Sequence, residues 1–236
     1  MQTIELSNLV IVLIPALLVV IIQWRWKLTP NTSLHALARM IIQLSLIGYA
    51  LSYIFNTENS FLVLTVLSVM LIASSWIALR SVPEKRYELF FVALTSTIIV
   101  NALLLALITQ LVLESVPWYA PRIVIPLAGM VFAAGMNSIS LFAERYFSEL
   151  KSSELKHGCD ELLARNTAYQ ATLIPTINSL FAVGLVSLPG MMTGQILSGV
   201  SPLIAVRYQI MIMLMLFASA GLTTALFYIL LKRKKI

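Results

Sequence analysis

Charged residues are scarce in this chain. They make up 11% of its 236 residues, whereas a soluble domain carries about 25%. Hydrophobic residues account for 59%, and the mean hydropathy is +0.92. This composition excludes an ordinary soluble domain and predicts an all-α integral membrane protein. Because apolar runs occupy nearly the whole length, we expect a single transmembrane domain over residues 1–236.

Cysteine and histidine are nearly absent as well. The single cysteine, Cys159, excludes an internal disulfide, and His35 and His157 lack the spacing of a metal-binding pair. No glycine is followed by lysine, so the phosphate-binding loop of nucleotide hydrolases is missing. We therefore expect no cofactor on this chain. If ATP drives the protein, another chain binds it, and the residues do not define a set of metal ligands.

Acidic residues are missing from the middle of every apolar run. Ion-coupled carriers usually place a carboxylate there, because the coupling ion needs a charged or titratable partner. This absence argues against a secondary transporter, a proton pump or a membrane enzyme that uses paired acids, so we expect no catalytic residue. The ten acids lie in loops or at the ends of runs: Glu5, Glu58, Glu84, Glu88, Glu114, Glu144, Glu149, Glu154, Asp160 and Glu161.

Long apolar runs are what the chain has in abundance. A helix that spans a bilayer needs about 20 apolar residues, and seven runs meet this length. The sequence therefore predicts a bundle of about seven transmembrane helices. The runs are about Ile4–Ile22, Leu37–Phe55, Phe61–Leu79, Leu89–Leu113, Ile123–Ala143, Leu173–Leu197 and Ile210–Leu231.

The lysines and arginines give this bundle an orientation. With seven spans, all of the 16 basic residues except Arg122 and Arg207 fall on one side. Basic loops stay in the cytoplasm, so we predict an outside N-terminus and a cytoplasmic C-terminus.

The one long loop, about residues 144–172, is then cytoplasmic. Helix-forming residues interrupted near His157-Gly158 predict either two short helices, or a continuation of the fifth span followed by a turn and a second helix. The loop is either a docking surface for a soluble partner or a solvated connector.

The least regular stretch is Leu185–Leu203, which reads LVSLPGMMTGQILSGVSPL. Its two prolines remove backbone donors, and its three glycines loosen a helix and permit close approach. The stretch is therefore either a tight helix-packing seam or the lining of a path through the membrane. If this stretch did not cross the membrane, the C-terminal KRKK cluster would lie outside. The charge pattern therefore favours a complete crossing over a re-entrant loop.

Several residues in and near this stretch are candidates to line a path. Side-chain amides, including that of Asn101, usually join helices within a bundle, but some of them lie beside the irregular stretch. The thioethers of two adjacent methionines suit soft metals, although methionine also fills gaps in apolar cores. The candidates are Gln43, Asn178, Pro189, Gly190, Met191, Met192, Gly194 and Gln195.

Residues 185–202, LVSLPGMMTGQILSGVSP, resemble the signature of the Fet-type iron-exporter permeases. These are membrane subunits of ABC transporters, and plant aluminium-tolerance permeases are related to them. The resemblance extends upstream through Leu173–Asn178 and downstream through Tyr208-Gln209. A second block, Ala38–Tyr49, resembles the second span of the family.

This resemblance implies a bacterial inner-membrane permease that exports iron or another metal ion. It implies a homodimer of the permease and a cytosolic ABC ATPase subunit that carries ATP–Mg. Residues 154–159 together with 173–175 resemble a relaxed form of the loop by which such permeases hold their ATPase, with a short helix at about Asp160–Ala168. The implied docking residues are Gly158, Cys159, Asp160, Glu161 and Arg165.

Two alternatives remain open at this point. The first keeps the fold and exports a sugar nucleotide or another small organic molecule. A path for a polyanion should be lined by basic residues, and only Arg122 and Arg207 are available for this. The second is a seven-helix receptor or membrane scaffold, which would need no companion ATPase.

Overall fold

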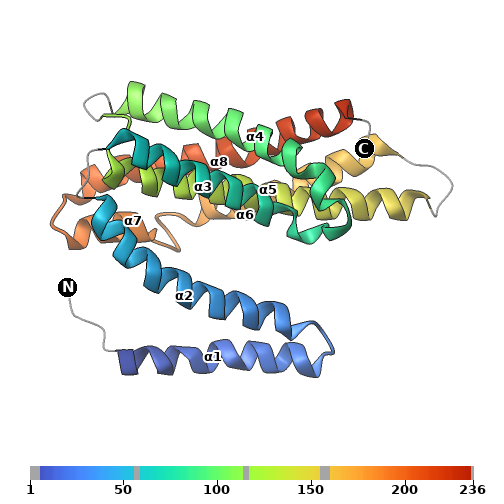
Figure 1. Cartoon of the computed structure of the whole chain (residues 1–236), viewed down its shortest axis with the longest axis horizontal. Helices are drawn as coiled ribbons and strands as arrows, with labels where there is room; N and C mark the ends of the chain where they lie inside the picture. Colours follow the sequence, from blue (N-terminus) through green and yellow to red (C-terminus); the bar gives the residue numbers. More distant parts are fainter. Residues whose placement is uncertain (1–5, 56–58, 114–116, 155–159, 235–236) are drawn as a thin grey trace. The chain divides into compact units, whose positions relative to one another are not determined.

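The computed structural model describes residues 6–55, 59–113, 117–154 and 160–234. In these ranges all regular secondary structure is helical, apart from one isolated bridge between Val183 and Ser187. Two 3-10 turns, Leu79–Ser81 and Pro83–Lys85, join α3 to α4, and a π-helical turn, Ile108–Val112, extends α4. The predicted all-α fold is confirmed. The helices are α1 (Leu6–Arg25), α2 (Pro30–Ile54), α3 (Ser60–Ala78), α4 (Arg86–Leu107), α5 (Pro121–Glu154), α6 (Glu161–Ala182), α7 (Gly190–Leu197) and α8 (Pro202–Arg233) (Figure 1).

The chain forms two compact units, Met1–Thr57 and Glu58–Ile236. The first unit holds α1 and α2, which contact each other. Lys27, with φ of 57°, turns the chain between them, and α2 begins at Pro30, where the missing N–H has no helical partner to lose. The second unit, here called the bundle, holds α3 to α8. A single transmembrane domain for the whole chain stays a prediction.

The centre of the bundle is formed by α5 and α8. Helix α5 contacts α3, α4, α6 and α8, while α8 also contacts α4, α6 and α7. One apolar core cluster includes Phe142 of α5 and Phe227 of α8, whose rings meet edge to face with centroids 6.2 Å apart. A second cluster includes Leu127 and Val131 of α5 and Ile212 of α8. Because lipid is as apolar as these side chains, close packing rather than escape from water holds such helices together.

A buried polar contact joins α4, α5 and α8. The Ser219 hydroxyl lies 2.8 Å from Asn101 Oδ1 and 3.0 Å from the carbonyl oxygen of Val131. Gly135 of α5 leaves the necessary space, since a Cβ there would lie 3.3 Å from both Asn101 Nδ2 and Thr223 Oγ1. The predicted role of the Asn101 amide as an interhelical contact is therefore confirmed.

Six helical segments in the described part of the chain are long and apolar enough to cross a membrane. They correspond to six of the seven predicted spans. The remaining one, the predicted sixth span Leu173–Leu197, is wrong as a continuous helix, because α6 ends at Ala182 and α7 begins only at Gly190. The six segments are Asn8–Arg25, Pro30–Ile54, Ser60–Ser81, Pro83–Val112, Pro121–Ser152 and Pro202–Arg233.

The long loop predicted over residues 144–172 is mostly helical. Helix α5 continues to Glu154, and α6 begins at Glu161 and runs on into the predicted sixth span. This confirms the second of the two predicted arrangements, in which the fifth span continues and a second helix follows. The predicted short helix at Asp160–Ala168 is the first part of the 22-residue α6. The predicted interruption at His157-Gly158 lies outside the described residues.

Several basic residues gather at one end of the bundle, here called the basic end. The Lys234 ammonium donates to the carbonyl oxygen of Glu88 at 2.8 Å, which ties the end of α8 to the start of α4. The Arg86 guanidinium lies 3.8 Å from the Trp76 ring and donates to the Trp76 carbonyl oxygen at 2.8 Å. The opposite end carries Arg207, near the start of α8 (Figure 1).

Replacing Gly135 by leucine should destabilise the bundle by about 1–3 kcal/mol, because the larger side chain would force α4 and α8 away from α5. The matched control is Gly48→Leu in α2, where a Cβ would meet no heavy atom within 4 Å. Thermal unfolding of the purified chain in detergent measures both variants. An equal unfolding temperature for the two variants would show that the contact at Gly135 is not a packing constraint.

Candidate functional site

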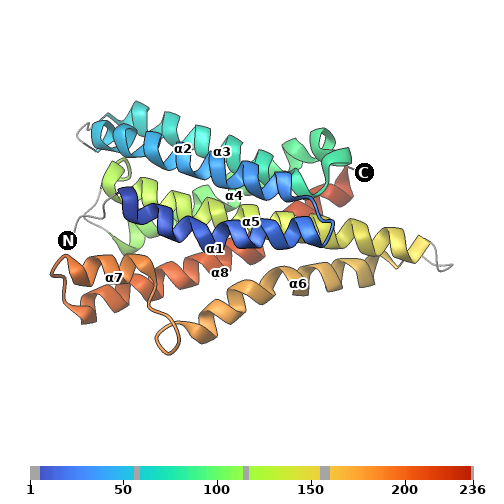
Figure 2. The same cartoon turned by 90° about the horizontal axis from the view of Figure 1, so that it is seen from below.

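The first candidate site is the break between α6 and α7, residues 183–189. Helix α6 starts at the basic end and is about 33 Å long, from 1.5 Å per residue. Helix α7 lies toward the opposite end of the bundle, where it contacts α8 (Figure 2). The two helices therefore run along the bundle one after the other, with the irregular segment between them.

The sequence explains why the helix stops here. The Ala182 carbonyl oxygen accepts from the backbone N–H groups of residues 185–187, at 2.8 to 3.3 Å, so the chain turns back at once. Gly184 has φ of 84°, a conformation that costs side-chain-bearing residues about 1–2 kcal/mol. Its N–H donates to the Ser187 carbonyl oxygen at 3.0 Å. Pro189 then precedes α7 and cannot continue α6, because it has no backbone donor.

The break presents apolar side chains outward. Phe181, Leu185 and Val186 are 78%, 91% and 84% exposed, so the described residues of the bundle leave them uncovered. Irregular backbone and exposed apolar side chains thus occur together at one place. An aqueous surface would disfavour these side chains, and lipid would disfavour this backbone.

The predicted path residues fall into three groups. Pro189, Gly190, Met191, Met192, Gly194 and Gln195 are brought together on and just before α7. Asn178 is exposed on α6, one turn before its end. Gln43 lies on α2, in the other compact unit.

The contacts of α7 distinguish residues that pack against the core from residues that could line a path. Met191 packs against the second core cluster, which supports a packing role for its side chain. Gln195 Oε1 is buried and has no hydrogen-bond partner among the described residues. Neither Gly190 nor Gly194 makes a close helix contact, since a Cβ at either position would meet no heavy atom within 4 Å. Close glycine contacts occur instead at Gly135 and Gly221.

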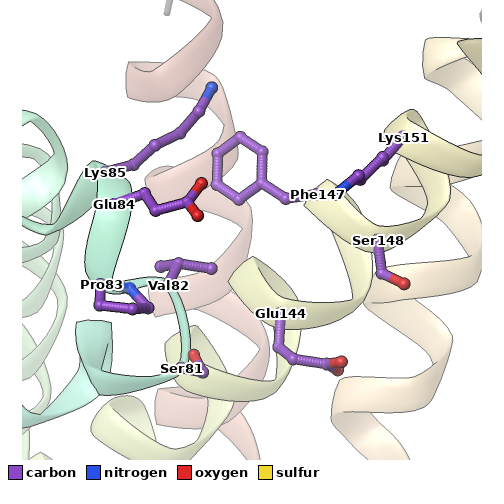
Figure 3. A pocket seen from close by; sticks show the side chains of 9 residues that line it. All are labelled: Ser81, Val82, Pro83, Glu84, Lys85, Glu144, Phe147, Ser148 and Lys151. Carbon is purple, nitrogen blue, oxygen red and sulfur yellow. The ribbon is translucent and has the colours of Figure 1, made fainter.

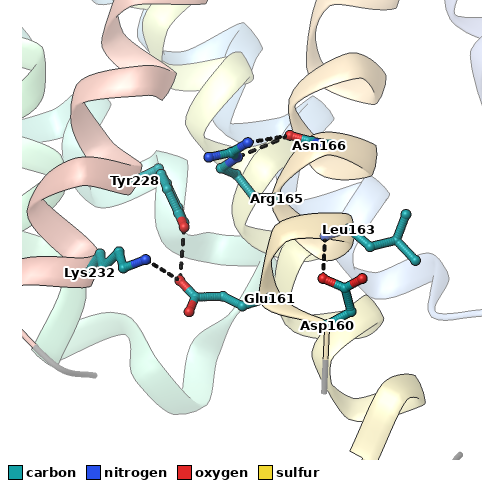
Figure 4. Close-up of polar contacts among 7 residues, drawn as sticks. All are labelled: Asp160, Glu161, Leu163, Arg165, Asn166, Tyr228 and Lys232. Carbon is teal, nitrogen blue, oxygen red and sulfur yellow. Dashed lines mark hydrogen bonds and ion pairs between the residues drawn. The ribbon is translucent and has the colours of Figure 1, made fainter. Parts of the chain in front are cut away.

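The second candidate site is the start of α6 at the basic end (Figure 4). The Asp160 carboxylate accepts from the Leu163 backbone N–H at 3.0 Å and so caps the helix. The Glu161 carboxylate accepts from the Tyr228 hydroxyl at 2.8 Å and lies 3.7 Å from the Lys232 ammonium. Both acids predicted from the sequence therefore position α6, one by capping it and the other by joining it to α8.

Arg165, the third predicted docking residue, lies one turn further along α6. Its guanidinium donates to Asn166 Oδ1 at 2.7 Å and lies 5.7 Å from the ring of Tyr228 (Figure 4). Its side chain is partly exposed, which leaves it accessible to a partner. Gly158 and Cys159, the other two predicted docking residues, lie outside the described residues.

Sequence reasoning missed two exposed leucines in the same turn. Leu162 and Leu163 are 60% and 59% exposed although they lie among charged residues. The signal was present in the sequence as an apolar pair inside the segment DELLARN. Exposed apolar side chains in a polar setting are typical of contact surfaces.

A cavity of about 280 Å³ lies nearby, between the α3–α4 connection and α5 (Figure 3). Glu84 and Lys85 line it from one side, and Glu144 and Lys151 line it from the other. The Lys85 ammonium lies 4.5 Å from the centre of the Phe147 ring. Sequence analysis assigned no role to these residues, since the cavity appears only when α5 continues past the predicted span.

Metal-binding side chains do not gather anywhere in the described part of the chain. It contains no group of three or more His, Cys, Asp or Glu residues that could hold an ion. The oxygen atoms near the break are those of amides, hydroxyls and backbone carbonyls. They could contact a passing cation only briefly, because none supplies the charge of a carboxylate.

Comparison with known proteins relates this geometry to named membrane proteins. The chain is 32% identical to the probable iron export permease protein FetB of Escherichia coli, over 97% of this chain and 91% of FetB. It is 35% identical to the UPF0014 membrane protein slr1647 of Synechocystis, over 87% of this chain and 83% of that protein. It is 32% identical to the protein ALUMINUM SENSITIVE 3 of Arabidopsis thaliana, over 90% of this chain and 80% of that protein. No solved structure matches the chain.

These similarities confirm the resemblance to Fet-type permeases and the assignment as an integral membrane protein. The family model described as "Uncharacterised protein family (UPF0014)" matches residues 6–236, which is nearly the full length. The chain therefore belongs to the UPF0014 family of membrane proteins.

Proposed function

We propose that this chain is the membrane-spanning permease subunit of an ABC transporter that exports iron or another metal ion. The observation that carries the proposal is the break between α6 and α7, which interrupts one helical path along an otherwise continuous apolar bundle. The break lies in the stretch that resembles Fet-type permeases. The similarity to FetB, named a probable iron export permease, supports the same function.

In this proposal α6 and α7 together make the seventh crossing. Six segments are long enough to cross alone, and the broken pair runs from the basic end toward the opposite end (Figure 2). The basic end would then face the cytoplasm, as expected for loops rich in lysine and arginine. The N-terminus is then outside and the C-terminus cytoplasmic.

The break would line the translocation path. Backbone that leaves the helix at membrane depth has to be buried in protein or line a watery cavity. The exposed Phe181, Leu185 and Val186 need an apolar cover, which a second copy of the permease would supply. In a homodimer, the two breaks would face a shared path.

The start of α6 would dock a cytosolic ATPase subunit, which binds ATP–Mg. Leu162 and Leu163 offer the apolar contact, and the partly exposed Arg165 offers a charged one. The contacts of Asp160 and Glu161 keep this turn ordered and fixed to α8. A movement imposed on the turn by ATP binding would therefore reach the membrane through α6. Gly158 and Cys159 complete the proposed docking segment.

The charge distribution favours a cation as cargo over a polyanion. All acids in the described part of the chain lie at the basic end, and the opposite end offers few basic residues. A metal ion would cross with brief contacts to amide and carbonyl oxygens such as those of Asn178 and Gln195. A sugar nucleotide would find few cations along the same route.

Transport by the chain together with its ATPase tests the function. Inside-out vesicles should take up Fe(II) or another divalent metal only when ATP is present, and ATP hydrolysis should increase with metal. Sugar nucleotides, tested in parallel, should not move. ATP-driven flux of a sugar nucleotide without metal flux would contradict the proposed metal cargo. If ATP drove no flux of either, the permease assignment would be wrong.

Replacing Gly184 by alanine should impair transport without preventing insertion. The positive φ of Gly184 would cost alanine about 1–2 kcal/mol, which changes the geometry of the break. Amide exchange of residues 185–188 should therefore accelerate, and the transport rate should fall. Gly48→Ala in α2 is the control, because a Cβ there meets no neighbour. Normal transport by Gly184→Ala would remove the break from the mechanism.

The double variant Leu162→Asp, Leu163→Asp should reduce the ATPase that co-purifies with the permease at least tenfold, as expected for central apolar contacts. Acidic residues in the first turn of a helix are favourable, so α6 itself should persist. Asp160→Asn, which keeps the capping group but removes the charge, should retain the ATPase. Retention by the leucine variant, with loss in Asp160→Asn, would assign docking to the charged residues instead.

A further inference from the structure

An apolar groove lies between α4 and α8, away from the break. It encloses about 430 Å³ and is lined by apolar side chains from both helices, among them Leu107, Ile108, Leu214 and Ala218. The single polar side chain in its lining is that of Arg207. An apolar groove with one cation is complementary to an anionic molecule with a long hydrocarbon chain.

The dimensions of the groove match one leaflet of a bilayer. On α8 it extends from Arg207 to Ala218, which is about 16 Å at 1.5 Å per residue. This is close to half of the hydrocarbon core, which is about 30 Å thick. Arg207 lies six residues into α8, near the end of the bundle, where a lipid phosphate would be placed.

Arg207 has no partner of its own among the described residues. The acids of the described part lie in the connection before α4, at the start of α4, on the last turns of α5 and at the start of α6, all at the basic end. Between described residues, ion pairs join Arg145 to Glu149 and Lys232 to Glu161, and neither pair includes Arg207. The guanidinium is therefore available for a phosphate, which it can bind through two parallel N–H donors.

The wall of the groove on the α4 side contains an irregular helical turn. Ile108 and Val112, which line the groove, begin and end the π-helical turn. Such turns are rare and occur frequently at functional sites. The turn gives this wall a shape that a regular α-helix would not have.

From these observations we propose that the groove binds one anionic phospholipid. Its phosphate lies on Arg207, and one acyl chain runs along α8 toward Ala218. The site is independent of the cargo, because it lies on the α4 side of α8 and includes none of the path candidates.

Native mass spectrometry of the full-length chain in detergent tests the site, with phosphatidylglycerol and phosphatidylcholine of identical acyl chains. The wild type should retain phosphatidylglycerol in preference to phosphatidylcholine. Arg207→Gln should lower phosphatidylglycerol retention about fivefold, which corresponds to about 1 kcal/mol for one basic residue beside an anionic lipid. Arg207→Lys should keep most of the preference, which also shows that the position accepts substitution.

Two further variants make the result specific. Arg122→Gln, on α5 and outside the groove, should leave retention unchanged. Ala218→Phe, which fills the inner end of the groove, should lower retention of both lipids. Equal retention of the two lipids by the wild type, or unchanged retention in Arg207→Gln, would overturn the proposal. So would a disulfide between two copies of Leu214→Cys in a Cys159→Ser background, because a second copy would then occupy the groove.

Discussion

The hydrogen-bonding demand of the backbone is the constraint on which this structure depends. In lipid, each N–H and C=O has to find a partner within the protein, so long uninterrupted helices are the ordinary solution. Six segments of the described chain that are long and apolar enough to cross a membrane are helical. The segment between α6 and α7 meets the demand only locally, through the turn at Ala182 and the left-handed Gly184. The proposed translocation path and the proposed dimer contact both follow from this one break in the helix.

The sequence is sufficient to predict the helices that obey this constraint. Hydropathy alone located six spans, because a run of about 20 apolar residues has few other structures open to it. It failed at Leu173–Leu197, where average hydropathy hides a glycine with positive φ and a proline. The resemblance identified the same stretch as the distinctive one, and the family match confirms that resemblance. Hydropathy measures the preference for lipid, but a helix break is decided by single backbone positions.

The candidate site was less predictable than the fold, because it depends on contacts between distant segments. Asp160 and Glu161 were identified from their place in the loop, yet their bonds to Leu163 and Tyr228 require the packing of α6 on α8. The exposure of Leu162 likewise becomes visible only when the buried face of α6 is known. Charge patterns indicate which residues lie near an aqueous end, but they do not distinguish a residue that meets a partner from one that holds its own helix.

The contact between Tyr169 and α8 has a mechanical consequence. The Tyr169 hydroxyl donates to the Gly221 carbonyl oxygen at 3.4 Å, and Gly221 leaves room for it. This point divides α6 into a short arm of about 12 Å back to Glu161 and a long arm of about 20 Å forward to Ala182, at 1.5 Å per residue. If a movement of the first turn releases the contacts of Glu161 with α8 and α6 rocks about Tyr169, the displacement is enlarged about 1.6-fold at the far end of α6, in the opposite direction. The position of Tyr169 along α6 therefore sets how much a displacement of the first turn is enlarged at the other end of the helix.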